Sequence, residues 1–195
     1  MRGSLLTERK GDRWNSILKS HQLRMLAVSV AAGVIAGLFI GTVRLGLGLP
    51  GHKSLFWMTP VIMARLLGRC KAGTTTGALS AAFTTLAVGG RLAGGVLGLG
   101  LIGFAGIVLD VVINSLEKRE MPALLVIPII GITAMLANLL CLVKRLLVPL
   151  GPGSHFVFGV SGFWFKLICY AFFGLTAGLI AATLACLINH RRQIR

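Results

Sequence analysis

Six apolar stretches, separated by short polar segments, make up most of this chain. They cover Leu23–Val43, Ser54–Leu67, Ala72–Val88, Leu92–Asn114, Pro122–Val148 and Val160–Ile188. An α-helix needs about 20 apolar residues to cross a bilayer core of about 30 Å. Four stretches reach that length, and the second and third are shorter. The pattern predicts an all-α polytopic membrane protein in which residues 23–190 form one six-helix transmembrane bundle.

Basic segments flank this domain on both sides. The N-terminal segment, residues 1–22, contains side chains that recur at helical spacing, with Arg and Lys between them. The repeating positions, which continue to the start of the first apolar stretch, are Trp14, Ile17, Leu18, His21 and Met25. Such a pattern is typical of a short helix that lies on an anionic membrane surface. A disordered basic tail is the alternative. Residues 191–195 are predicted to form a second basic, cytoplasmic tail.

Composition agrees with a membrane protein. The chain is 55% hydrophobic and only 13% charged, whereas a soluble domain carries about 25% charged residues. The net charge of +15 would suit a nucleic-acid-binding protein. However, the basic residues lie at the ends of the apolar stretches, and no basic stripe with interleaved aromatic residues occurs. We therefore expect contact with the lipid bilayer and none with nucleic acid.

The distribution of Lys and Arg predicts the orientation in the membrane. With a cytoplasmic N-terminus, 14 of the 20 basic residues fall on the cytoplasmic side. The other six are Arg44, Lys53, Arg91, Lys144, Arg145 and Lys166. The positive-inside rule then places both termini in the cytoplasm, with an even number of spans in the plasma (cytoplasmic) membrane. The loops at 46–54, 88–92 and 149–159 would face outward.

The first apolar stretch carries small residues at intervals of four. The members of this repeat are Ala27, Ala31, Ala32, Ala36, Gly33 and Gly37. Small residues on one helix face allow another helix to approach closely in lipid. We interpret the repeat as a partner-contact face, and packing within the bundle is the alternative.

Asp110 is the only acidic residue inside an apolar stretch. An intramembrane carboxylate is a functional candidate by default. Because Asp110 lies about one turn from the predicted cytoplasmic end, we expect a structural ion pair with Lys118 or Arg119, or with Arg65 or Arg69 of the neighbouring loop. A proton relay is the alternative.

No catalytic constellation is present in the sequence. Paired carboxylates, nucleophile elbows, zinc-protease motifs and phosphate-binding loops are missing. The four cysteines and four histidines are scattered, without metal-ligand spacing. We therefore expect no enzyme activity, no metal site and no cofactor.

The predicted outer side instead combines aromatic residues with a few positive or hydrogen-bonding groups. The candidate substrate-binding residues are His52, Lys53, Trp57, Arg91, Asn138, His155 and Trp164. An apolar pocket with positive donors suits a small organic anion. The alternative is that these residues only anchor helix ends at the membrane interface.

With these features the chain resembles the substrate-binding S-components of energy-coupling factor (ECF) transporters. The resemblance rests on six spans with cytoplasmic ends, on the small-residue repeat, and on the Gly- and Pro-containing loop 46–54 that leads into Phe56 and Trp57. It implies a protein that binds a vitamin or similar micronutrient from outside. It also implies that an Ala-x-x-x-Ala face of the first helix packs on a transmembrane coupling protein, which two cytoplasmic ATPases drive.

The chain departs from the family pattern in two ways. It lacks the N-terminal Met-His pair of the cobalt and nickel members, and it shows no substrate-specific signature. The leading hypothesis is a solute-binding uptake subunit. A non-catalytic integral subunit of a larger energy-transducing complex is the second, and a lipid-modifying membrane enzyme is a third that the missing acid–base groups disfavour.

Overall fold

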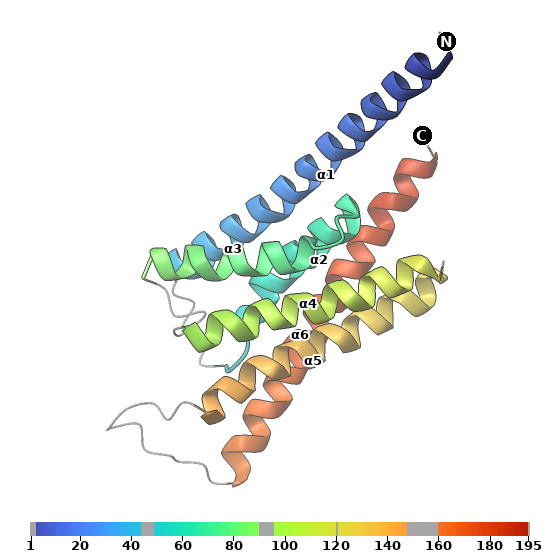
Figure 1. Ribbon diagram of the computed structural model, residues 1–195. Helices are drawn as coiled ribbons and strands as arrows, with labels where there is room; N and C mark the ends of the chain where they lie inside the picture. The colour runs from blue at the N-terminus through green and yellow to red at the C-terminus, as the bar shows by residue number, and fades with distance from the viewer. Residues whose placement is uncertain (1–2, 44–48, 90–95, 120, 148–159, 195) are drawn as a thin grey trace.

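The structure, a computed structural model, describes residues 3–43, 49–89, 96–119, 121–147 and 160–194 (Figure 1). Within these ranges, the side chains of residues 3–21, 96, 144–147, 160–161 and 192–194 are not described. Every regular element in the described part is a helix: α1 Gly3–Thr42, α2 Lys53–Gly68, α3 Gly73–Ala87, α4 Val96–Lys118, α5 Ala123–Leu147 and α6 Val160–Ile194. The all-α prediction is therefore confirmed, and each predicted apolar stretch is a helix.

Four of these helices are long and apolar enough to cross a membrane. The qualifying segments are Gln22–Thr42, Leu97–Lys118, Ala123–Val143 and Gly162–Arg191. Helices α2 and α3 have 16 and 15 residues, so at 1.5 Å per residue each is about 22 to 24 Å long, less than the bilayer core. The chain thus has the character of a membrane protein, and the described part contains four candidate spans rather than six.

The six helices close into a ring in the order α1, α3, α4, α5, α6, α2. Each packs against its two neighbours in this order, and α2 also contacts α3. Figure 1 shows the start of α1 and the end of α6 at the same end of the bundle. The short helix α2 is extensively buried, with Met58, Val61 and Ile62 fully enclosed.

Alanine and glycine set the spacing between the helices. The core includes Ala78, Ala105, Ala134 and Ala177, each fully buried. A Cβ atom at Gly178 of α6 would lie 2.8 Å from the carbonyl oxygen of Ile130 in α5. Many other large apolar side chains are exposed on the surface of the bundle, among them Ile35, Leu124 and Ile168.

Helix α1 is longer than predicted. The sequence predicted a separate interfacial helix, or a disordered tail, before the first membrane span. One continuous helix of 40 residues runs from Gly3 to Thr42. Figure 1 shows its N-terminal part extending beyond the rest of the bundle. Because Gly3–Thr42 contains no proline, nothing in this segment forces a helix end.

The small-residue face of α1 is divided between internal packing and the surface. A Cβ atom at Gly33 would overlap the Gly77 carbonyl oxygen of α3, and one at Gly37 would lie 2.6 Å from the Ala81 oxygen. Ala36 is 3% exposed. These three residues pack inside the chain, as the alternative interpretation of the repeat expected. Of the other members, Ala32 is half-buried, and Ala27 and Ala31 are exposed.

Candidate functional site

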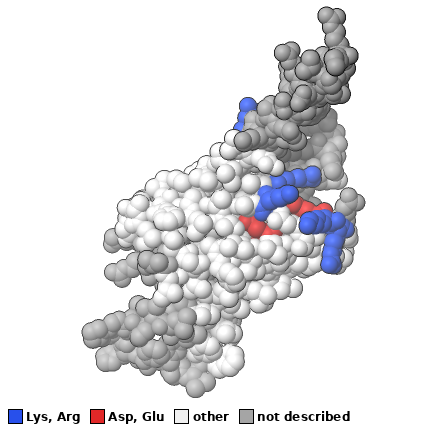
Figure 2. All heavy atoms as spheres, viewed as in Figure 1, with Lys and Arg blue, Asp and Glu red and all other residues white. Residues whose placement is uncertain are grey.

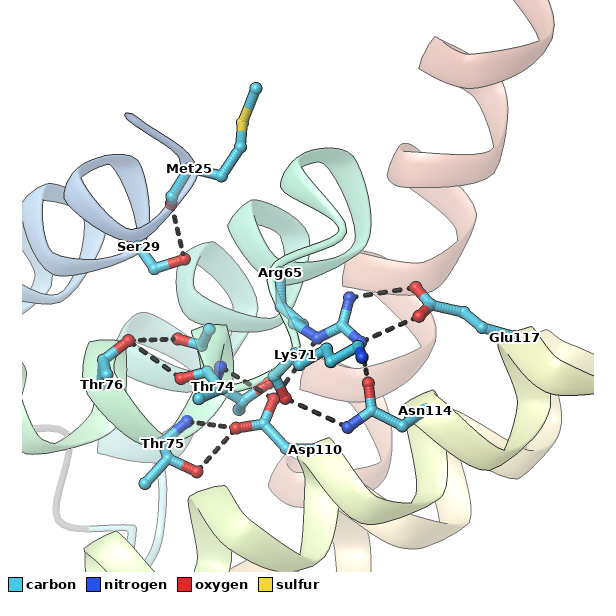
Figure 3. Close-up of polar contacts among 12 residues, drawn as sticks. Met25, Ser29, Arg65, Lys71, Thr74, Thr75, Thr76, Asp110, Asn114 and Glu117 are labelled. Carbon is cyan, nitrogen blue, oxygen red and sulfur yellow. Dashed lines mark hydrogen bonds and ion pairs between the residues drawn. The ribbon is translucent and has the colours of Figure 1, made fainter. Parts of the chain in front are cut away.

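Two polar clusters, each built around a buried side chain, occupy opposite ends of α2. The first, here called the arginine network, consists of Arg65, Asp110, Asn114 and Glu117 (Figure 3). The guanidinium of Arg65, whose side chain is 0% exposed, donates two hydrogen bonds of 3.0 Å to the Glu117 carboxylate. It also donates to Asn114 Oδ1. Arg65 Nε lies 3.4 Å from Asp110 Oδ1, forming an ion pair without hydrogen-bond geometry.

Asp110, which lies in α4, also caps the N-terminus of helix α3. Its carboxylate accepts hydrogen bonds from the backbone N–H groups of Thr74 at 3.0 Å and Thr75 at 2.8 Å, and from the Thr75 hydroxyl at 2.6 Å. The residue before α3, Ala72, has no side-chain cap to offer. The first N–H groups of a helix lack partners inside it, and a negative charge there is favourable. Asp110 therefore supplies from α4 the N-cap that α3 lacks.

Asn114 closes the network on its other side. Its Nδ2 group donates to the Lys71 carbonyl oxygen at 3.1 Å, while its Oδ1 atom accepts from Arg65. The turn between α2 and α3, the start of α3 and the last turns of α4 are thereby held together. A buried charge is tolerated when such partners satisfy it, and here each carboxylate has at least two hydrogen bonds.

The structure selects one of the predicted partners of Asp110. The ion pair forms with Arg65, whereas Arg69, Lys118 and Arg119 are exposed. Figure 2 shows charged side chains gathered at one end of the visible face. Sequence reasoning missed Asn114 and Glu117. The signal was present, because residues four and seven positions after Asp110 lie on the same helix face.

The second cluster, here called the histidine cluster, lies where α2 begins and joins it to α5 and α6. Asn138 Nδ2 donates to the Tyr170 carbonyl oxygen at 2.7 Å and to Ser54 Oγ at 3.0 Å. Ser54 Oγ in turn donates to the Gly51 carbonyl oxygen at 2.7 Å. Gly51 has a φ of +83°, and a Cβ atom there would lie 3.0 Å from the Tyr170 ring. Only glycine suits this position.

His52 completes the cluster and leaves one polar atom unsatisfied. The residue is 9% exposed, and its Nδ1 atom hydrogen-bonds the Leu49 carbonyl oxygen. A carbonyl only accepts, so Nδ1 carries a proton and Nε2 of the neutral ring is an acceptor. This Nε2 atom is buried and has no hydrogen-bond partner. The His52 ring packs edge to face against Phe173, with ring centroids 6.5 Å apart.

Of the predicted substrate-binding residues, the structure brings only His52 and Asn138 into this cluster. Lys53, the first residue of α2, follows His52 in the chain and is half-buried. Trp57 is 2% exposed within the hydrophobic core. Trp164 is 54% exposed and shares its side of α6 with exposed Ile168. Arg91 and His155 lie outside the described residues. Ser54 and Tyr170 were not predicted, and no sequence signal beyond their helix positions identified them.

The chemistry available to the described part is hydrogen bonding and ion pairing. No group of three or more His, Cys, Asp or Glu side chains in this part could hold a metal ion. His52 Nε2 can accept a hydrogen bond from a ligand, or donate one to a carboxylate when the ring is protonated. The histidine cluster is therefore the candidate site for a small molecule. In the arginine network, the buried Arg65 Nε atom also lacks a hydrogen bond, but it lies 3.4 Å from the Asp110 carboxylate as an ion pair.

Comparisons of the chain with protein-family models, with curated proteins and with solved structures found no match.

Proposed function

We propose that this protein is an integral membrane solute-binding subunit for uptake of a small organic, vitamin-like micronutrient. The histidine cluster carries the proposal, because its buried His52 Nε2 atom has neither a hydrogen-bond partner nor an ion pair within the described residues. Buried polar groups normally have a partner, and an exception calls for an explanation such as a ligand. A polar residue within a membrane bundle is also a functional candidate by default.

The proposed ligand is an organic anion. A carboxylate would accept a hydrogen bond from His52 in its protonated form, and Lys53, the next residue, would add positive charge. Arg91, outside the described residues, would add a second charge if it lies on the same outer side, as the sequence predicts. A guanidinium grips a carboxylate through two hydrogen bonds, which a lysine cannot reproduce. The resemblance to ECF S-components motivates the rest of the proposal, in which a transmembrane coupling protein and cytoplasmic ATPases drive uptake. Ala27 and Ala31, which remain exposed, would form the contact with that partner.

Ligand binding tests the proposal. We expect His52→Ala and Arg91→Ala each to weaken binding of a carboxylate vitamin at least tenfold, and Arg91→Lys to weaken it less, because charged hydrogen bonds contribute about 1.5–3 kcal/mol each. The measurement is mass spectrometry of the small molecules that co-purify with the protein, followed by titration of the one identified. His190→Ala, an exposed position near the end of α6, is the control. Parent-like binding by both alanine variants would contradict the site.

The membrane topology is a separate prediction. We expect both termini and Ser115 to be cytoplasmic and Ser154 to be outside, because of the 14 basic residues on one side. In a background without native cysteines, a membrane-impermeant thiol reagent added to intact cells should label Ser154→Cys and leave Ser115→Cys unlabelled. Ser115 is exposed on α4, so in permeabilised cells it should react. The opposite labelling would place the histidine cluster on the cytoplasmic side.

A second candidate function is a non-catalytic subunit of a larger membrane complex. The observation that favours it is the position of Trp57, which is enclosed in the core and so packs against protein instead of lining a pocket. Purification from native membranes separates the two candidates. A bound small molecule favours the uptake subunit, and a stable set of unlike proteins without one favours the second.

A further inference from the structure

We propose that one end of this protein holds a discrete binding site for an anionic phospholipid. The headgroup would bind to a basic patch, defined here as Arg69, Lys71, Lys118 and Arg119, and the acyl chains would lie along one face of α4. This inference goes beyond solute binding and depends only on the chain being a membrane protein.

The charges of the patch are available to a ligand. All four side chains are exposed. Nearby, the carboxylates of Asp110 and Glu117 already face Arg65, at 3.4 and 3.0 Å. No salt bridge of the described residues includes a member of the patch. Figure 2 shows Lys and Arg side chains on both sides of the acidic ones at this end of the visible face. The patch therefore retains a net positive charge.

The arginine network fixes the spacing of the two segments that supply this charge. Arg69 and Lys71 belong to the turn after α2, and Lys118 and Arg119 to the end of α4. Asn114 joins them, because it hydrogen-bonds the Lys71 carbonyl and lies one turn before Lys118. Arg69 itself has a φ of 51°, with its N–H bonded to the Arg65 carbonyl. The backbone at Lys71 is thus joined to α4 through the Asn114 side chain (Figure 3).

An apolar stripe on α4 favours a lipid over a soluble anion. Phe104, Ile107 and Val111 are 51%, 48% and 58% exposed. Residues at these spacings share one helix face, and Lys118 lies seven positions after Val111 on the same face. A phospholipid with its phosphate at Lys118 would place its acyl chains along this stripe. Anionic lipid is attracted to basic residues at the cytoplasmic surface.

Binding of defined lipids to the full-length protein tests the proposal. Native mass spectrometry in detergent, with phosphatidylglycerol and phosphatidylcholine as probes, should show a preference for the anionic lipid. Lys71→Gln combined with Lys118→Gln should weaken phosphatidylglycerol binding by about tenfold or more. The control combines Arg24→Gln with Arg191→Gln, which removes the same charge from exposed positions on α1 and α6. It should change phosphatidylglycerol binding by less than twofold.

A neutral substitution distinguishes a site from general attraction. Asn114→Leu keeps the net charge but removes the link to Lys71, so it should weaken phosphatidylglycerol binding about threefold. If it fails to fold, the charge variants decide alone. Equal losses in the patch and control pairs would overturn the proposal, as would displacement of the lipid by inorganic phosphate at similar concentration. If the patch variants bind lipid normally but no longer co-purify with an acidic protein, the patch would be a protein-contact surface instead of a lipid site.

Discussion

Replacing Arg65 with Met should lower the free energy of unfolding by about 3 kcal/mol, because removal of one partner leaves a buried charge uncompensated. Met has a similar length, so the change removes charge and hydrogen bonds with little loss of volume. Asp110, with its side chain 7% exposed, would keep its bonds to the start of α3 but lose its counter-charge. Unfolding of the purified protein by heat or denaturant in detergent, followed by circular dichroism, measures the loss.

A second substitution and a matched control make the measurement specific. Adding Asp110→Asn to Arg65→Met removes the stranded charge and should recover part of the stability. Arg69→Met makes the same side-chain change at an exposed position four residues later and should shift stability by less than about 0.5 kcal/mol. Equal losses for Arg65→Met and Arg69→Met would mean that the network contributes nothing to stability.

The helices could be predicted from the sequence because their apolar stretches are continuous and the breaks contain glycine, proline and charge. The turn Gly68 to Gly73 and the segment after Thr42 are examples. The ring order of the helices could not be predicted. It depends on which small residues meet, and Gly33 and Ala31 look equivalent in the sequence although one is enclosed by α3 and the other is exposed. The length of α1 was also not predicted. A basic amphipathic segment has the same sequence pattern whether it forms a separate helix or the first part of the membrane-spanning helix.

Site residues could be predicted from the sequence only where a residue type is rare in its surroundings. A carboxylate inside an apolar stretch singled out Asp110. Arg65 was one of four predicted partners, and the tertiary structure was needed to select it. Its bonds to the N–H groups of Thr74 and Thr75 required the tertiary structure, because a backbone donor carries no sequence signal. The same applies to Asn138, whose strongest partner is the carbonyl of Tyr170. Trp57 lies in the hydrophobic core, whereas the sequence alone suits either the core or a pocket wall, because an aromatic residue near a helix start occurs in both.

Gly33→Ala should destabilise the protein by about 1–3 kcal/mol, the typical cost of overpacking. Its Cβ atom would overlap the Gly77 carbonyl oxygen and the Ser80 hydroxyl of α3, and backbone cannot move aside as a flexible side chain can. The two helices would have to separate. That would weaken the hydrogen bonds from Ser80 Oγ to the Val30 carbonyl and from Thr85 Oγ1 to the Gly37 carbonyl, now 3.1 and 3.2 Å. Unfolding in detergent is again the measurement.

Gly100→Ala provides the control, because a Cβ atom there would meet nothing within 4 Å. Alanine is the better helix former by about 1 kcal/mol, so Gly100→Ala should leave stability unchanged or raise it. Gly37→Ala should act like Gly33→Ala, since its Cβ atom would lie 2.6 Å from the Ala81 oxygen and 2.8 Å from the Thr84 Cβ atom. If both α1 variants were as stable as Gly100→Ala, α1 and α3 would not pack through this face. Gly33 and Gly37 would then be available again for contact with a partner protein.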